Sequence, residues 1–218
     1  MTETCSGVNL GASILPLAMS ADVTILDTSA RLAVAVSDAR FLIALAFTLK
    51  WEGGFVDNPF DPGGATNMGI TQAVYDAWRL ANGHPTQSVE FISMSEVQAI
   101  YRQLYWDKAL CSMFAAPLDA VQFDSAVNFG VRPANKLLQT AVNDLNSTNG
   151  TAATGLKVDG ILGPVSLAAI AIENPIELSG EYMSLRVVRY VDLAAGKSSL
   201  LVFLRGWLHR SGALLGIF

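Results

Sequence analysis

The sequence predicts a mainly α-helical, globular fold, and two observations point to it. Hydrophobic residues make up 51% of the 218 residues and charged residues only 15%, so the chain can bury a continuous core. Apolar residues also recur at helical spacing along most of the chain, with Gly or Pro at the borders of these segments. The spacing predicts helices over residues 28–36, 38–52, 72–81, 95–106, 117–129, 133–145, 164–173, 177–194 and 198–210.

The longest interruption of this helical pattern is the segment 55–67, which is dense in Pro, Gly, Asp and Asn. Such a composition predicts turns with a small hairpin. Ser37 or Asp38 is expected to cap the helix before this segment, and Thr71 and Ser95 are expected to cap the two helices after it. We therefore predict an N-terminal extension over 1–37, a central region over 38–132 and a helical C-terminal region over 133–218.

Charge and hydropathy exclude several classes of protein. The net charge of −5 and the pI near 4.9 provide no basic stripe, so nucleic acid is not an expected partner. The longest apolar runs, 41–47 and 200–204, fall short of the ~18 residues of a membrane span, so no integral membrane segment is expected. No Lys or Arg precedes the apolar stretch 11–20, which argues against a signal peptide. Cys5 and Cys111 lack metal-ligand spacing and are expected to be reduced.

Glu52 is the first candidate for chemistry. Cleavage of a glycosidic bond needs a protonated carboxylic acid beside the leaving oxygen. Glu52 is expected at a helix C-terminus, where the macrodipole disfavours negative charge, and the apolar neighbours Trp51 and Phe55 are expected to desolvate it. The glycines at 53 and 54 leave space for a polymer close to the backbone. From these residues alone Glu52 is either a general acid or a solvated residue at a helix end.

A second carboxylate usually handles water or the charge of the transition state. Asp61 is the first choice, because nine residues of turn-rich chain can bring its carboxylate opposite Glu52. Asp57 lies nearer in sequence and is the alternative, or it ties the loop by an Asx turn. Thr66 follows on the same segment.

The chain resembles glycoside hydrolase family 108, a family of phage and bacterial N-acetylmuramidases. Five motifs carry the resemblance: WEGGFVDNPFDPGGATNMGIT (51–71), YWD (105–107), FDSAVNFG (123–130), VDGILGP (158–164) and FLRGWLHR (203–210). The motif VDGILGP is similar to a predicted peptidoglycan-binding segment. It covers about residues 40 to 211. The chain departs from the family pattern at Trp51, where histidine is expected, and at Phe129, where a small residue is expected.

The resemblance implies a lysozyme-like fold and hydrolysis of the β-1,4 bond between N-acetylmuramic acid and N-acetylglucosamine, with Glu52 as the acid. It implies peptidoglycan as the partner and no cofactor. The order Glu52, Asp61, Thr66 is also similar to the phage-type lysozyme triad, in which the acid and the threonine manage the attacking water. The spacing from Asp61 to Thr66 is one residue shorter than in that pattern.

Further polar residues are candidates for substrate binding. Asp57 lies in the turn segment and Thr71 follows it, and Asp124 and Asn128 lie four residues apart on one predicted helix face. The last two could line a sugar cleft, or they could form a buried pair that ties helices together. Proline in the turn segment argues against a calcium loop, so no metal is expected.

Two other functions are compatible with the same sequence features. A lytic transglycosylase uses a single acid and forms a 1,6-anhydro product without water. A non-catalytic wall-binding or virion structural protein would keep the fold and dock through residues 1–39. As a muramidase, the protein is expected in the host cytoplasm until its release to the cell wall or periplasm, or on the virion.

Overall fold

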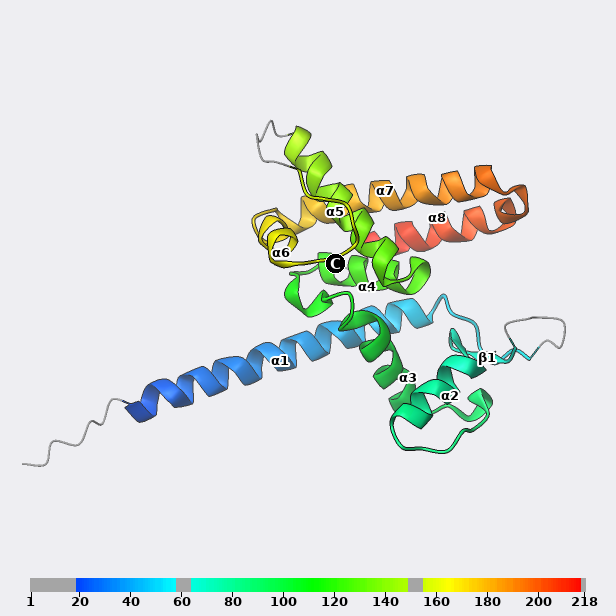
Figure 1. The fold of residues 1–218 in the computed structure, drawn as a ribbon, viewed down its shortest axis with the longest axis horizontal. Coiled ribbons are helices and arrows are strands. Elements are labelled where there is room, and N and C mark those ends of the chain that lie inside the picture. The colour runs from blue at the N-terminus through cyan, green and yellow to red at the C-terminus, as the bar shows by residue number, and fades with distance from the viewer. Residues whose placement is uncertain (1–18, 58–63, 149–154, 217–218) are drawn as a thin grey trace, which may run out of the picture. The chain divides into compact units, whose positions relative to one another are not determined.

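Helices dominate the computed structural model, which describes residues 19–57, 64–148 and 155–216 (Figure 1). The prediction of a mainly α fold with a small hairpin after the helix that precedes Glu52 is confirmed. The chain divides into two compact units, residues 1–37 and residues 38–218. Glu52 and all helices after the first belong to the second unit.

Eight α-helices and two short strands make up the regular structure of the described residues. The helices are α1 Met19–Leu49, α2 Gln72–Ala81, α3 Met94–Tyr101, α4 Leu118–Phe129, α5 Val131–Thr148, α6 Pro164–Ala171, α7 Pro175–Gly196 and α8 Leu201–Leu215. The strands are β1 Thr66–Asn67 and β2 Ile70–Thr71, and a π-helical segment, Arg102–Trp106, follows α3. All helices predicted after residue 71 therefore occur, with ends that differ by a few residues.

The prediction of separate helices over 28–36 and 38–52 is wrong, because α1 runs through both. Neither Gly nor Pro interrupts the sequence between Met19 and Leu49, so nothing ends the helix at Ser37. Asp38 is therefore no N-cap. Its carboxylate accepts a hydrogen bond of 2.7 Å from Arg102 instead.

The segment Ala30–Leu49 of α1 is the one described segment that is long and apolar enough to cross a membrane. Charged residues break its apolar runs, so counting uninterrupted runs does not detect it. From Asp38 onward the same helix supplies Phe41, Ala44 and Leu45 to the core of the second unit. A core helix passes the same test of length and composition.

The turn segment after Glu52 closes into a hairpin. Thr66 pairs with Thr71 and Asn67 with Ile70, in antiparallel register, and Val56 forms an isolated bridge with Thr66. Thr71 then caps α2, as predicted, because its hydroxyl accepts a hydrogen bond from the Val74 amide. The β-strands thereby fix the start of α2.

The cap of α3 differs from the prediction. Ser93, rather than Ser95, is the N-cap. Glu96 stands three residues after Ser93, and its carboxylate accepts a hydrogen bond from the Ser93 backbone amide, which completes a capping box. The two serines were equally plausible caps from residue type alone. The position of the glutamate decides between them.

Helix α4 is the centre of the second unit, and its residues from Leu118 to Ala126 are all buried. Phe123 and Ala126 face a core that includes the second half of α1, α2, α3 and the π-helical segment. Leu118 and Val121 face another core that is built with α5, α6, α7 and α8. Helix α7 contacts α4, α5 and α8, and Figure 1 shows α7 and α8 side by side. Polar residues of α4 are consequently buried as well.

Candidate active site

Glu52 lies on the turn that follows α1, three residues beyond the end of the helix. The amides of Lys50 and Trp51 still bond back to Phe47 and Thr48, at 3.1 and 3.0 Å, so the chain turns tightly into Glu52. The Glu52 side chain is 21% exposed. It is thus accessible to a substrate but held by its surroundings.

The two carboxylate oxygens of Glu52 have different neighbours. Oε1 accepts a hydrogen bond of 3.0 Å from Nη1 of Arg210 on α8. Oε2 faces Gly69, where a Cβ atom would lie 2.9 Å from Oε2 and 2.5 Å from the hydroxyl of Tyr101. Gly69 also has a φ of +74°, a conformation that glycine adopts at no steric cost. A side chain at position 69 would therefore displace Glu52 or Tyr101.

Two tyrosines on α3 and the π-helical segment stand near this carboxylate. Burial, and to a smaller extent the negative charge of Glu52, raise the pKa of both Tyr101 and Tyr105 above the ordinary value. Both phenols therefore stay protonated at neutral pH. The Tyr101 hydroxyl donates a hydrogen bond of 2.8 Å to the Met68 carbonyl, which fixes the turn that holds Gly69.

Arg210 also contacts the buried carboxylate of Asp124 on α4. Its Nη2 lies 2.6 Å from Oδ1 of Asp124, and its Nε lies 3.1 Å from the same oxygen. Arg186 on α7 binds the other oxygen, Oδ2, at 2.6 Å, and the Thr48 hydroxyl donates to Oδ1 at 3.0 Å. Glu52, Arg210, Asp124 and Arg186 form a chain of alternating charges, which we call the four-residue ion network.

The charges of this network stabilise each other. Burial disfavours the charge of Asp124, but the guanidinium groups of Arg186 and Arg210 outweigh it and lower the pKa of Asp124 below its ordinary value. Burial likewise opposes the charge of Arg210, and the carboxylates of Asp124 and Glu52 raise its pKa. Asp124 is therefore the counter-ion that Arg186 and Arg210 share.

Asp124 and Asn128 were predicted either to line a sugar cleft or to tie helices together. Asp124 is only 1% exposed and is surrounded by its own partners. Asn128 donates to the backbone and side-chain oxygens of Asp124, at 2.7 and 3.3 Å. This geometry matches the second alternative, because Asp124 has no free face toward a substrate.

Other predicted site residues lie around the hairpin. Asp57 is exposed, Thr71 uses its hydroxyl to cap α2, and the Thr66 hydroxyl lies 3.4 Å from the Gly64 carbonyl. Asp61 falls outside the described residues. The geometry therefore leaves the partner of Glu52 as a prediction.

The expected apolar surroundings of Glu52 differ from those observed. Trp51 packs against Phe47 and His209, and Phe55 is 40% exposed. The groups that contact the carboxylate are polar instead. Arg210, Tyr101 and Gly69 are the residues of the site that sequence reasoning missed. Arg210 ends the FLRGWLHR motif, and that motif was the only signal for it.

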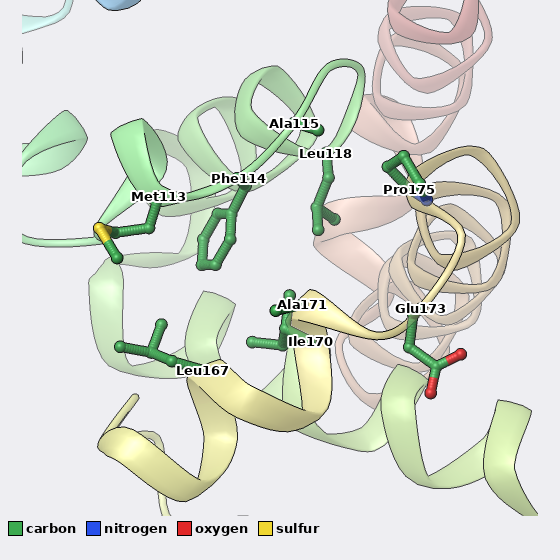
Figure 2. Close-up of a pocket in the computed structure, with 9 residues that line it drawn as sticks. All are labelled: Met113, Phe114, Ala115, Leu118, Leu167, Ile170, Ala171, Glu173 and Pro175. Atoms are coloured by element: carbon green, nitrogen blue, oxygen red, sulfur yellow. The ribbon is translucent and has the colours of Figure 1, made fainter. Parts of the chain in front are cut away.

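A separate pocket of about 270 Å³ lies between α6 and the start of α4 (Figure 2). Its walls include Met113, Phe114, Leu118 and Leu167, and Glu173 is the only lining residue with a charged side chain. Neither Glu52 nor another member of the ion network lines it. We assign it no part in the chemistry at Glu52.

A partly exposed carboxyl group such as that of Glu52 is what a glycoside hydrolase uses as one of its two carboxyl groups. The family model described as glycosyl hydrolase 108 matches residues 45–130, and the model described as predicted peptidoglycan domain matches residues 133–212. The structure of Brucella abortus SagA is similar, with 30% sequence identity and a TM-score of 0.63. The similarity covers 82% of this chain and 93% of the SagA chain. No protein with a curated description matches the chain.

The chain belongs to the glycosyl hydrolase 108 family, as its resemblance indicated. The two matched regions also define its class of substrate. A glycoside hydrolase region followed by a peptidoglycan domain makes this protein a peptidoglycan hydrolase. The ion network joins these regions, because Glu52 and Asp124 lie in the first and Arg186 and Arg210 in the second.

Proposed function

We propose that the protein is an N-acetylmuramidase, which hydrolyses the β-1,4 bond between N-acetylmuramic acid and N-acetylglucosamine, with Glu52 as the general acid. The observation that carries this proposal is the environment of Glu52. Its carboxylate is partly exposed, and a buried arginine holds one of its two oxygens. Glycosidases need an acid in this position, beside the leaving oxygen.

The two oxygens of Glu52 then have different tasks. Arg210 donates to Oε1, so this oxygen is an acceptor and the catalytic proton belongs on Oε2. Oε2 packs against Gly69, where a Cβ atom would lie only 2.9 Å from it, so the acid keeps this position only because residue 69 has no side chain. The proton passes from Oε2 to the glycosidic oxygen as the bond to the leaving sugar breaks.

Water must attack the sugar after or during this step. We assign its activation to Asp61 and Thr66, with Asp57 as the alternative carboxylate. This assignment rests on the spacing of these residues from Glu52 in the sequence. Asp61→Asn and Thr66→Ala, measured separately on purified sacculi, test it, and turnover near the native rate in either variant removes that residue from the mechanism.

The products of digestion test the reaction itself. The protein is incubated with purified sacculi, and the released fragments are analysed by mass spectrometry. Hydrolysis adds water and leaves a reducing N-acetylmuramic acid end. A 1,6-anhydro end would instead identify a lytic transglycosylase, and a reducing N-acetylglucosamine end would identify cleavage of the other glycosidic bond. Either of the last two results overturns the muramidase proposal.

We assign this activity to lysis of the bacterial cell wall, with the protein held in the host cytoplasm until release or carried on the virion. The family supports this role through its substrate. A non-catalytic wall-binding or virion protein is the alternative, with residues 1–39 as the docking element. A zymogram decides between them, because an enzyme clears the embedded wall and a binding protein leaves it intact.

A further inference from the structure

Three positively charged side chains of α5 and α7 line one hollow. Five arginines each pair with a carboxylate: Arg40, Arg79, Arg102, Arg186 and Arg210. Arg132, Lys136 and Arg189 have no ion-pair partner among the described residues, yet all three line one hollow of about 600 Å³ between α5 and α7. In a chain with a net charge of −5, this convergence of positive charge marks an anion site.

The guanidinium groups of this hollow, which we call the basic hollow, are already held in place. Arg132 donates from Nε to the Asp159 carbonyl at 3.1 Å, which leaves its two terminal nitrogens for a ligand. The Arg189 guanidinium lies over the ring of Phe129, 5.1 Å from its centre. The Nε of Arg189 is buried and has no hydrogen-bond partner within the described ranges. A buried donor without a partner is costly.

The walls of the basic hollow show which anion fits. Pro133 and Leu137 give it an apolar side. A neighbouring hollow of about 520 Å³ shares Leu137 and Arg189 with it. Its walls combine the aliphatic Leu185, Val188, Leu193 and Leu200 with the charged Asp192 and Lys197. A ligand that carries carboxylates next to small aliphatic groups matches both hollows. The space exceeds what an inorganic ion alone would fill.

We propose that the basic hollow binds the peptide stem of peptidoglycan through a free carboxylate of that peptide. This inference rests on the proposed function, because it takes peptidoglycan as the bound polymer. Arg132, Lys136 and Arg189 receive the carboxylate, and Leu137 contacts the aliphatic part of the peptide. Binding at this hollow holds the wall while the glycan strand is cut at Glu52.

Calorimetric titration of the full-length Glu52→Gln protein tests this binding without turnover. The probe is a soluble tetrapeptide of the peptidoglycan stem, compared with the same peptide with every carboxylate converted to an amide. We expect the amidated peptide to bind about tenfold more weakly or worse, because a charge-assisted hydrogen bond is lost. Equal affinity for the two peptides, or no binding of the free peptide, overturns the proposal.

Lys136→Gln provides the variant, and Lys108→Gln is its matched control, because both lysines are exposed and both changes remove one positive charge. Lys136→Gln is expected to weaken binding of the free peptide about tenfold and to leave the amidated peptide unaffected. Lys108→Gln is expected to bind like the parent protein. Equal affinities of the two variants contradict the assignment.

A competition experiment completes the test. Inorganic phosphate that displaces the peptide at equal concentration would show a general anion site and overturn the specific proposal. The proposed function fails separately, in the digestion of sacculi by the native protein. If the peptide binds but sacculi are not cleaved, only the proposed enzymatic function is refuted. If sacculi are cleaved but the peptide does not bind, only the proposed peptide site at the basic hollow is refuted.

Discussion

Glu52 and Asp124 are two carboxylates that share one arginine, and they differ in burial. Glu52 lies on a turn and is 21% exposed, whereas Asp124 lies within α4 and is 1% exposed. Arg210 gives Glu52 one hydrogen bond, but it contacts Asp124 through both Nε and Nη2. Asp124 therefore holds the Arg210 guanidinium in place, and Glu52 is free to act on a substrate.

The largest effect on stability is expected from Asp124→Asn. The change leaves Arg186 buried without its counter-ion and Arg210 with Glu52 alone, and breaking a buried pair costs about 3–5 kcal/mol. Chemical denaturation measures this loss in the free energy of unfolding. The matched control is Asp144→Asn, a half-buried residue near the C-terminal end of α5. Equal stabilities of the two variants would contradict the role of Asp124.

Arg210→Lys is expected to lower turnover of sacculi about tenfold, because lysine cannot bind both carboxylates through a planar fork. Glu52 loses its fixed position, while one positive charge remains beside Asp124. The rate is measured with the folded fraction determined by circular dichroism. Arg205→Lys on the same helix serves as the control. A native rate in folded Arg210→Lys protein shows that Glu52 does not depend on this arginine.

The contribution of Asp124 should also depend on pH. Its pKa is lowered by folding, so its stabilising effect is complete above the unfolded value of 3.8 and is lost as the pH falls through the lower folded value. The difference in unfolding free energy between native protein and Asp124→Asn is expected to be constant from pH 7 down to that range and then to narrow. Denaturation at a series of pH values measures it. If this difference in unfolding free energy grows as the pH falls, the predicted stabilisation by the Asp124 carboxylate is contradicted.

The smallest effect is expected from Tyr182→Phe, away from Glu52. The buried Tyr182 hydroxyl lies 2.8 Å from Oε1 of Gln122 and 2.9 Å from the Ala134 carbonyl. Its removal should cost about 1–2 kcal/mol of stability, because the acceptors lose their donor, and should leave turnover unchanged. Thermal unfolding and the sacculus assay measure the two quantities. Loss of turnover at native stability would mean that the site extends further than the ion network.

Local features of this chain were predictable from its sequence. Thr71 caps α2 because a hydroxyl residue precedes an amphipathic segment, and Glu52 stands out because its motif is contiguous. The single helix α1 was not predicted, since Ser37 and Asp38 are as typical of a cap as of an exposed helical position. The N-cap of α3 was expected at Ser95 instead of Ser93, because both residues are serines close to the start of the helix. Local pattern alone leaves such choices open.

The ion network depends on contacts that no local pattern contains. Arg210 lies 158 residues from Glu52 in the sequence, and 86 from Asp124. The local sequence around an aspartate on a helix face does not distinguish a face that meets solvent from one that packs against two arginines. Only the packing of α7 and α8 against α4 makes Asp124 a buried counter-ion. The sequence pattern lacks the tertiary contacts on which the ion network depends.

Turnover of purified sacculi by Glu52→Gln tests the central claim most directly, with Glu90→Gln, at an exposed glutamate, as the matched control. Loss of the general acid is expected to reduce the rate about 100- to 10,000-fold in a protein that remains folded, and Glu90→Gln is expected to keep the native rate. Native turnover by folded Glu52→Gln protein would contradict the assignment of Glu52 as the acid.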